Sequence, residues 1–417
     1  MEHVVVLHCG SLLTRPGEPP MRKATLVVRN DKISDVLQGY RDWRTFEAPG
    51  RTIEFIDLSD RFVLPGLIDA HVHLTGQMDA MSKLRQVTES DADAALRGAL
   101  YARRTLDAGF TTVRDVGASG DAIFALRDAI NRGDVPGPTI LAAGAPITPT
   151  GGHGDDTHGF REDLFPVPGP AQGVADGPYE ARKAVRYQVK RGADVIKVTA
   201  TGGVLSDTNA GTSQQFFPDE LEAIVATAHA LGRKVAAHAH GADGIKAALR
   251  AGVDSIEHGT FLDDEAVSLF QQTGAFLVPT LLAGRTVTEI AQSKRGYFPP
   301  AVRTKALAVG PVLQKAFAKA LAGGVRIAFG TDSGVSPHGQ NAREFALMVE
   351  AGMTPMQAIV AATTSAATLL GVDDRVGRLT PGMQADVIAV EGDPLRDVRA
   401  LERVVFVMKA GRVHTAP

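Results

Sequence analysis

Between residues 60 and 370, one pattern of hydrophobic and polar positions recurs along the chain. A short apolar segment is followed by a loop rich in glycine and polar residues, and then by a segment with apolar positions at helical spacing. The apolar segments predict eight strands, at residues 62–73, 111–117, 139–144, 194–200, 234–240, 254–259, 275–280 and 326–333. Strands that alternate with helices indicate a parallel sheet, and eight of them predict an α/β fold closed as a (β/α)8 TIM barrel.

A doubly wound open sheet is the structural alternative to the barrel. The chain has no G-x-G-x-x-G turn after an early strand, which counts against a dinucleotide-binding sheet of that kind. The predicted helices at 218–232, 242–252 and 263–274 each end in a glycine just past the last apolar position, as helix C-termini commonly do. We therefore favour the barrel.

The two ends of the chain differ from the middle. Residues 1–60 and 380–417 alternate short strands with turns and show no convincing helical pattern. Each segment is too small to hold a hydrophobic core alone. We therefore expect one small β-sandwich built from both termini, beside a barrel that spans residues 61–379.

Two predicted loops, at 145–178 and 281–300, exceed the usual length of a barrel connection. Together with residues 204–217 they are expected to form the walls of a site and to set its specificity. Aromatic residues in these segments could line a hydrophobic pocket or could simply anchor the loops: Phe160, Phe165, Tyr179, Phe216, Phe217, Tyr297 and Phe298.

Composition excludes several classes of partner. The 417 residues include 44 Lys and Arg against 47 Asp and Glu, so no basic surface predicts a nucleic acid or an anionic membrane as partner. No apolar run reaches the length of a membrane span. The first residues lack the pattern of an export signal, which favours the cytoplasm, although a removed signal would leave no trace. The single cysteine, Cys9, excludes an internal disulfide.

Candidate chemistry lies at the C-terminal ends of the predicted strands, where barrel enzymes place their sites. Five of the 12 histidines, one lysine and one aspartate fall there: His71, His73, Lys197, His238, His240, His258 and Asp332. A single histidine at a strand end is more often an ordinary polar group than a ligand. This many at one end of one barrel predict a metal site, and imidazoles with a carboxylate suit zinc or another divalent transition ion.

Lys197 stands in the middle of an apolar strand, where a lysine is rarely found. Burial would lower the pKa of its amine, and a neutral amine can react with carbon dioxide to form a carbamate. Such a carbamate is an anionic bridge that two cations would hold. The alternatives are a side chain that reaches solvent, or a salt bridge to a strand-end acid such as Asp115.

These motifs resemble the amidohydrolase superfamily, in its binuclear branch with a carboxylated lysine. The similarity spans essentially the whole chain, and it is carried by these motifs: PGLIDAHVHL (65–74), IKVTATGG (196–203), VAAHAHG (235–241), IEHGT (256–260), GTDSG (330–334) and GRLTPGMQADVIAVEGDPL (377–395). GGHGD (151–155) and HAHG (238–241) resemble the imidazolonepropionase-like and Xaa-Pro-dipeptidase-like group.

The resemblance implies a role for each matching residue. His71, His73 and Asp332 would hold a buried metal, His238 and His258 an outer one, and carboxylated Lys197 would bridge the two. His240 is a rival for His238 as ligand, and is otherwise expected to face the substrate. His153 would polarise the scissile carbonyl or hold the substrate carboxylate, and His338 is a further candidate contact. Asp332 would take the proton of the attacking hydroxide that the two cations share.

The function that the resemblance implies is hydrolysis of the amide bond in N-acyl amino acids or dipeptides with a free C-terminal carboxylate. Lactone or phosphotriester hydrolysis on the same two metals, for which the ligand types favour zinc, is the first alternative. A mononuclear deaminase or imidazolonepropionase needs no strand lysine, so Lys197 counts against it. A non-catalytic, dihydropyrimidinase-like scaffold would have lost ligands, whereas every ligand position is filled here. The resemblance also implies a homo-oligomer, with an octamer among the candidates.

Overall fold

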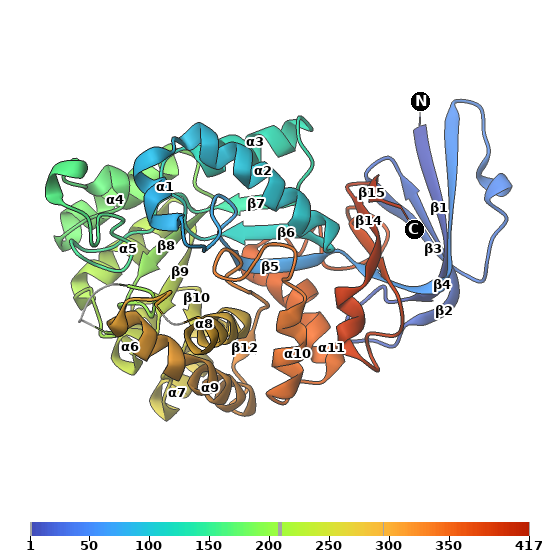
Figure 1. Cartoon of the computed structure of the whole chain (residues 1–417). Helices are drawn as coiled ribbons and strands as arrows, with labels where there is room; N and C mark the ends of the chain where they lie inside the picture. Colours follow the sequence, from blue (N-terminus) through green and yellow to red (C-terminus); the bar gives the residue numbers. More distant parts are fainter. Residues whose placement is uncertain (1, 207–210, 295, 417) are drawn as a thin grey trace.

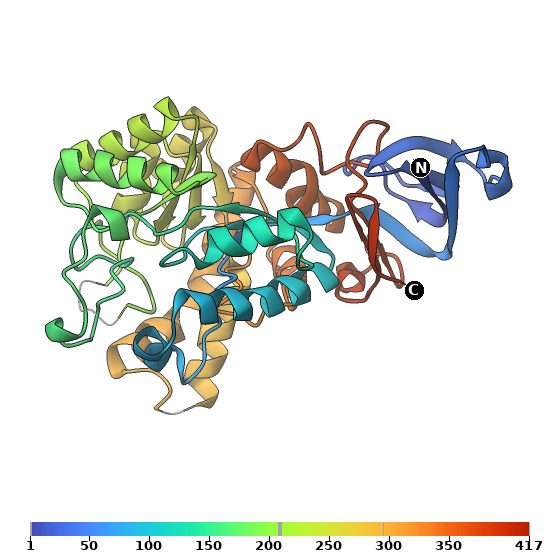
Figure 2. The same cartoon turned by 90° about the horizontal axis from the view of Figure 1, so that it is seen from above.

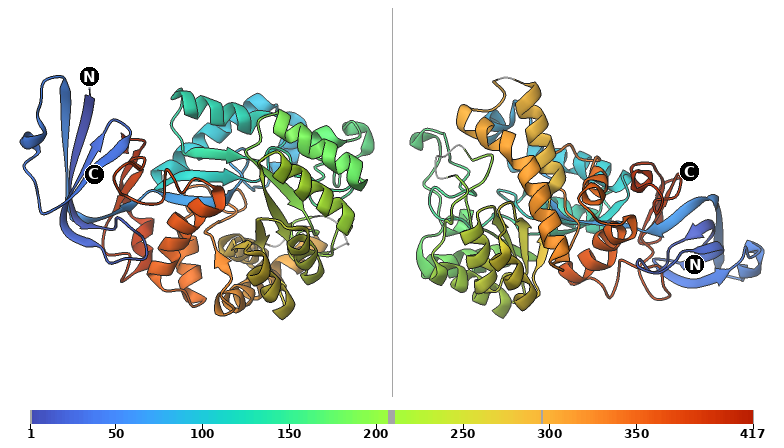
Figure 3. Two further views of the ribbon diagram at one scale, coloured as in Figure 1. Left: turned by 180° about the vertical axis from the view of Figure 1, so that it is seen from behind. Right: turned by 90° about the horizontal axis from the view of Figure 1, so that it is seen from below.

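The computed structural model describes residues 2–206, 211–294 and 296–416. It consists of an α/β barrel with a twisted β-sheet beside it, and both chain termini lie on that sheet (Figure 1). Views from above, behind and below show the same side-by-side arrangement (Figures 2 and 3). The barrel confirms the predicted fold class.

The sheet beside the barrel has seven strands, drawn from both ends of the chain. Their order is β15 (Arg412–Thr415), β14 (Val404–Lys409), β13 (Val387–Val390), β4 (Arg51–Pro65), β1 (Glu2–Leu12), β2 (Met21–Arg29) and β3 (Lys32–Gln38). β13 pairs with β4 in antiparallel register, Val387 opposite Pro65, which joins the two chain ends. Apolar side chains on both faces of β1 are buried because each face packs into its own hydrophobic cluster.

Eight strands of the described residues form the barrel, in two arcs. One arc holds β5 (Leu67–Val72), β6 (Phe110–Asp115) and β7 (Thr139–Ala142). The other holds β8 (Val195–Thr199), β9 (Lys234–Ala239), β10 (Ser255–His258), β11 (Phe276–Val278) and β12 (Arg326–Ile327). Neighbouring strands within each arc are parallel.

Backbone hydrogen bonds beyond the strand ladders join the two arcs. At the first seam, between β7 and β8, the amide of Ile147 donates to the carbonyl of Lys197 at 2.8 Å. At the second seam, between β12 and β5, the amide of Asp332 donates to the carbonyl of His71 at 2.8 Å. The segment after β12 therefore lies directly against the strand that carries His71.

Helices surround the strands, as a parallel barrel requires. They are α1 (Ser82–Thr88), α2 (Asp91–Asp107), α3 (Ala122–Arg132), α4 (Gly177–Lys190), α5 (Pro218–Ala230), α6 (Ala242–Ala251), α7 (Asp264–Thr273), α8 (Leu281–Ser293), α9 (Pro300–Ala322), α10 (Arg343–Glu350), α11 (Pro355–Val360) and α12 (Ala366–Leu370). Short 3₁₀ turns are η1 (Trp43–Phe46), η2 (Glu162–Leu164), η3 (Pro170–Gln172) and η5 (Val398–Glu402), and η4 (Ala361–Ser365) is a π turn between α11 and α12.

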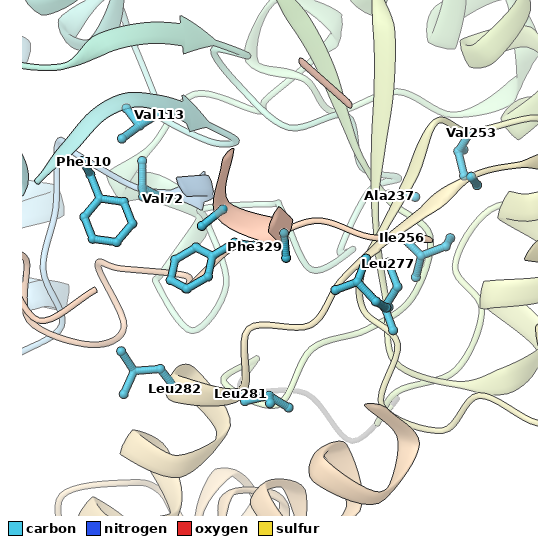
Figure 4. Close-up of a cluster of buried hydrophobic side chains, with 14 of the residues drawn as sticks. Val72, Phe110, Val113, Ala237, Val253, Ile256, Leu277, Leu281, Leu282 and Phe329 are labelled. Carbon is cyan, nitrogen blue, oxygen red and sulfur yellow. The ribbon is translucent and has the colours of Figure 1, made fainter. Parts of the chain in front are cut away.

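One continuous core fills the barrel and the space beneath its helices. Phe110 and Phe329 lie close together near β5, while Ile256 of β10 and Leu277 of β11 lie on two strands that pair with each other (Figure 4). Burial of such side chains contributes about 25 cal/mol per Å² of apolar surface. No helix of the described segments is both long and apolar enough to cross a membrane.

Three local predictions were wrong. The predicted strand 62–73 is two elements, because β4 ends in the seven-stranded sheet at Pro65 and β5 begins at Leu67. The predicted loop 281–300 is mostly α8, whose buried positions recur at helical spacing. The first 60 residues contain the short turn η1, which strand alternation alone could not indicate. β4 also runs across residue 60, and the domain limits at 60 and 380 stay a prediction.

Candidate metal centre

The residues predicted to carry the chemistry surround one cavity of about 520 Å³ at the C-terminal ends of the barrel strands. They come from β5, β8, β9 and β10 or the residues directly after them, and from the segments after β7 and β12. The lining includes all predicted metal ligands and both predicted substrate contacts: His71, His73, His153, Lys197, His238, His240, His258 and Asp332.

The Asp332 carboxylate faces His71 of β5 and His73, which directly follows that strand. Its Oδ1 lies 3.5 Å from Nε2 of His71 and 3.3 Å from Nε2 of His73. The other ring nitrogen of each histidine is already held: Nδ1 of His71 lies 2.7 Å from the Glu257 carboxylate, and Nδ1 of His73 lies 2.8 Å from the carbonyl of Gly117. Because Nδ1 is held in both rings, Nε2 of each is directed toward Asp332 and is free to bind a metal.

A second group of histidines lies beside the first. The ligand nitrogens of His238, His240 and His258 lie within 4.8 Å of one another. Nδ1 of His240 lies 2.6 Å from the hydroxyl of Thr260, and Nδ1 of His258 lies 2.6 Å from that of Thr280. His238 and His240 both belong to the group, so either can supply the ligand from β9.

The two groups share one residue. Ligand atoms of His71, His258 and Asp332 also lie within 4.8 Å of one another, so His258 stands between the two clusters. The rings of His71 and His258 have centroids 5.1 Å apart. Two ligand groups that meet at one histidine fit a pair of adjacent metal ions better than two separate sites.

Lys197 projects from β8 into the same cavity and is 4% exposed. Its side-chain amine makes no hydrogen bond or ion pair with any residue that the structure describes. The predicted alternative, a salt bridge to Asp115, is wrong because that carboxylate accepts the amides of Leu74 and Gly117 instead. Burial lowers the pKa of the Lys197 amine to about 8, although the charges of Glu257 and Asp332 oppose the shift.

Burial also keeps most of the imidazoles neutral, which a metal ligand must be. It lowers the pKa of His71 to about 4 and that of His240 to about 3. The pKa values of His238 and His258 fall well below the ordinary range, first by burial and then by neighbouring histidines. Lost hydration is therefore the main cause in all four rings.

The pKa values of His73 and Asp332 both shift against the effect of burial. Burial acts to lower the pKa of His73, but the hydrogen bond and charge of Asp332 outweigh it, and the pKa is raised. Burial acts to raise the pKa of Asp332, but His71, His73 and Lys197 bring it down to about 2. Asp332 is therefore a carboxylate at neutral pH, as a metal ligand or proton acceptor must be.

A buried ion pair behind His71 was not predicted. Arg114 on β6 donates from Nη2 to Glu257 at 2.8 Å, from Nη1 to Ser255 at 3.1 Å and from Nε to the carbonyl of Ala70 at 2.6 Å. The charge of Arg114 and the hydrogen bond of His71 bring the pKa of Glu257 to about 2, against the effect of burial. Glu257 thus stays charged and fixes the orientation of the His71 ring.

His153 reaches the cluster from the long loop after β7. Its ring stacks on His238 with centroids 4.1 Å apart, and its Nδ1 lies 2.5 Å from the hydroxyl of Ser206. Gly203 makes room for it, since an added Cβ there would lie 2.2 Å from Cε1 of His153. Lys305 of α9 donates to the carbonyls of Gly203 and Ser206, which fixes the segment that holds the ring.

Three residues at strand ends adopt left-handed backbone conformations that L-residues rarely occupy. These are His258 (φ 73°), Thr280 (φ 51°) and Asp332 (φ 57°). Such conformations are costly and persist where the surrounding structure imposes them, commonly in functional sites. All three residues line the cavity, and Thr280 bonds to His258 directly.

The apolar part of the wall is aliphatic. It comes from the segments before α5 and after β12 and from α8 and α9: Val204, Leu205, Ala283, Val287, Val309, Leu313 and Val335. Of the two roles left open for the aromatic residues of these loops, pocket lining is not supported, because none of them lines this cavity. Phe160 packs on Phe165, and Tyr297 packs on Phe298. Residues 207–210 of the predicted wall 204–217 lie outside the described residues.

His338 does not join the cluster. Its Nε2 lies 2.8 Å from the carbonyl of Gly76, and its ring stacks on Tyr101 at 4.6 Å. It lines a different hollow, with Arg104 and Arg343. The suggested role of His338 as a substrate contact was therefore wrong, because its ring packs against α2.

The donor set fits divalent transition ions. It offers imidazole nitrogens, a carboxylate and an amine of lowered pKa, with no thiolate. The barrel and this site together are typical of enzymes that can hold metal ions at the ends of their strands.

Comparisons with known proteins identify the family. Residues 62–414 match the amidohydrolase family, and the chain belongs to it. The ochratoxinase of Aspergillus niger is 35% identical over 434 aligned residues, which cover 99% of this chain and 87% of that protein. The chain is thus a hydrolase that acts on amide or peptide bonds.

Two solved structures are similar over the whole chain. A Xaa-Pro dipeptidase with methionine bound in its active site has a TM-score of 0.94 and 44% identity, and the match covers 99% of this chain and 100% of that one. A prolidase complexed with N-methylphosphonate-L-proline has a TM-score of 0.88 and 29% identity, with coverage of 99% and 100%. The predicted resemblance is confirmed at the level of the family.

Proposed function

We propose that this chain is a binuclear metal hydrolase that cleaves the amide bond of dipeptides or N-acyl amino acids with a free C-terminal carboxylate. The observation that carries the proposal is the pair of ligand groups that share His258, with Lys197 beside them in the same cavity and without a charged partner. No described residue forms an ion pair with Lys197 that would explain why its amine is buried.

The geometry supports a proposed ligand set. His71, His73 and Asp332 would hold one ion, and His258 with His238 or His240 the other. Lys197, as a carbamate formed with carbon dioxide, would supply the bridging anion. Zinc is the expected metal. When bound, two such ions would polarise the scissile carbonyl and lower the pKa of an attacking water.

Asp332 would transfer the proton, and His153 would contact the developing oxyanion or the substrate carboxylate. Asp332, with a pKa of about 2, accepts the proton of the attacking water through its carboxylate and returns it to the departing amine. His153 is held neutral, because burial lowers its pKa to about 4, and its Nδ1 is held at Ser206. Its Nε2 can then donate a hydrogen bond to the developing oxyanion or to the substrate carboxylate.

The substrate class is supported by the cavity and by the similar proteins. A volume of about 520 Å³ suits a molecule of dipeptide size. Ochratoxin A, cleaved to phenylalanine and ochratoxin alpha, is a candidate because of the similarity to ochratoxinase. The aliphatic wall favours substrates with aliphatic side chains, so we expect these to be turned over as well.

The test is amino-acid release by zinc-reconstituted protein of measured metal content. The panel contains dipeptides, N-acyl amino acids, their C-terminal amides and ochratoxin A. We expect release from the free acids and much less from the amides. No release from any member, with two metals bound, would contradict the proposal and favour lactone or phosphotriester hydrolysis, which the same protein is assayed for in parallel. No metal and no turnover would favour the scaffold alternative. Light scattering of the same sample tests the predicted homo-oligomer, with the octamer as one expected mass.

A further inference from the structure

Asp156 is a carboxylate on the cavity wall that the proposed chemistry does not use. It lies on the long loop after β7, three residues beyond His153, and it lines the cavity. Of the described lining residues, only Asp156 and Asp332 are acidic. Since Asp332 belongs to the ligand groups, Asp156 requires another explanation.

Asp156 joins the two segments that flank the ligand clusters. The hydroxyl of Ser119 donates to its Oδ2. Ser119 follows closely on Gly117, whose carbonyl holds His73, while His153 on the other side stacks on His238. The carboxylate therefore lines the same cavity as the ligand groups, on the side where the segment after β6 meets the loop after β7.

No ion pair within the described residues compensates this charge, although His158 on the same loop acts to lower the pKa of Asp156. No Lys, Arg or His of the described residues forms an ion pair with Asp156, whereas Asp163 on the same loop pairs with Arg161. Burial raises the pKa of Asp156, and the charge of Asp155 raises it further. The side chain is nevertheless exposed, because it opens into the cavity. Asp156 opens into the cavity and has no ion-pair partner among the described residues. Such a carboxylate is suited to bind a cationic group of a ligand.

We propose that Asp156 binds the protonated α-amino group of a dipeptide, so that the site prefers dipeptides with a free amino end over N-acyl amino acids. This inference rests on the proposed function, whose substrate class it narrows. In a dipeptide the α-amino group lies one carbon from the scissile carbonyl, so a cation at Asp156 would place that carbonyl near the two ligand groups. A hydrogen bond to a charged group of this kind is worth roughly 10- to 100-fold in kcat/KM.

The test compares two substrates that differ only in the amino group. L-alanyl-L-leucine and N-propionyl-L-leucine share one carbon skeleton, and the leucine side chain suits the aliphatic wall. We expect the zinc-loaded enzyme to favour alanyl-leucine by roughly 10- to 100-fold in kcat/KM. In Asp156→Asn, which can still accept the Ser119 hydrogen bond, the ratio should fall to about one. Asp163→Asn, which removes a charge from the same loop outside the cavity, should keep the wild-type ratio.

Each outcome bears on the inference. A wild-type ratio near one would overturn it without any variant, and so would an Asp156→Asn enzyme that loses both activities equally. If the metal-loaded wild type hydrolysed neither substrate, the proposed function would fail and this inference with it. Hydrolysis of propionyl-leucine alone would keep the proposed function and overturn the role of Asp156.

Discussion

At the scale of single residues, buried charges identify this site. Lys197, Arg114 and Glu257 all stand within apolar strands and are all at most 4% exposed. The signal that singles out Lys197 in the sequence, a charged residue within a predicted strand, is equally present at Arg114 and Glu257. Charged side chains inside strands are rarely kept without a partner or a role. The charged residues Arg114 and Glu257 within predicted strands therefore point to the ion pair that holds His71.

Replacing Arg114 by methionine tests that support. Glu257 would keep its place beside His71 but lose its guanidinium partner, and an uncompensated buried charge costs roughly 3–5 kcal/mol. Metal affinity should fall by about 10- to 100-fold, because the orientation of the His71 ring depends on Glu257. Chelator competition measures the affinity and urea unfolding the stability. Arg103→Met, which breaks an exposed pair with Asp107, should change neither. Unchanged metal affinity in Arg114→Met would show that Glu257 alone orients the ring.

Metal uptake should depend on pH and carbon dioxide through Lys197. The pKa of its amine is lowered to about 8, so the ammonium predominates below that pH and the reactive free amine above it. Uptake of zinc by metal-free protein should therefore become faster as pH rises through about 8, and bicarbonate should accelerate it. Lys197→Ala should lose the bicarbonate dependence and regain part of its metal with a short-chain carboxylate. The measurement is bound zinc against time, and uptake indifferent to bicarbonate would contradict a carbamate.

Some residue-level assignments were beyond the sequence. His238 and His240 share one face of β9, and the structure places both in the same ligand group. The partners of the site histidines come from distant segments: Thr260, Thr280 and Ser206. Such contacts depend on how loops close in space, which spacing along one strand cannot express.

At the scale of elements, periodicity located the strands and the helices α5, α6 and α7 but failed at α8. Gly284 and Thr288 weaken the helical signal of this segment, since neither residue favours a helix interior. Packing against α9 overrides that preference: the hydroxyl of Thr288 donates to the carbonyl of Ala306 at 2.8 Å. The carboxylate of Glu344 also accepts the amides of Leu281 and Leu282 at the start of the helix. Both contacts span long sequence distances.

The loop that carries His153 depends on a glycine in another segment. In Gly203→Ala the new methyl would collide with the imidazole, moving it from His238 and Ser206. We expect kcat/KM to fall on the order of 100-fold with metal content unchanged, because a small displacement of an oriented group is enough. Gly169→Ala is the matched control, since an added methyl there meets nothing within 4 Å. If the variant retained full activity, His153 would not act on the substrate; if it lost metal, His153 would belong to the metal site.

At the scale of the whole molecule, strands from both chain ends pair in one sheet and the middle of the chain forms the barrel, while the domain limits at residues 60 and 380 stay a prediction. The sequence could not indicate that the barrel consists of two arcs joined only by isolated bridges among the described residues. His71 and His73 belong to the arc of β5, while Lys197, His238 and His258 belong to the arc of β8. The predicted ligands therefore stand on both sides of the seams.

Metal removal should consequently loosen the barrel rather than the molecule as a whole. An ion present at 100 times its Kd adds about 2.7 kcal/mol to the folded state, so the melting temperature should fall when a chelator removes it. The loss should concentrate where the ions would tie the arcs together. Amide exchange should rise at the seam of Ile147 with Lys197 and at that of His71 with Asp332. The seven-stranded sheet, whose contacts the ligands do not touch, serves as the internal control. Exchange that rises equally in the sheet and at the seams would show that the metals stabilise the fold globally, and unchanged exchange in protein proven metal-free would show that the arcs hold together without them.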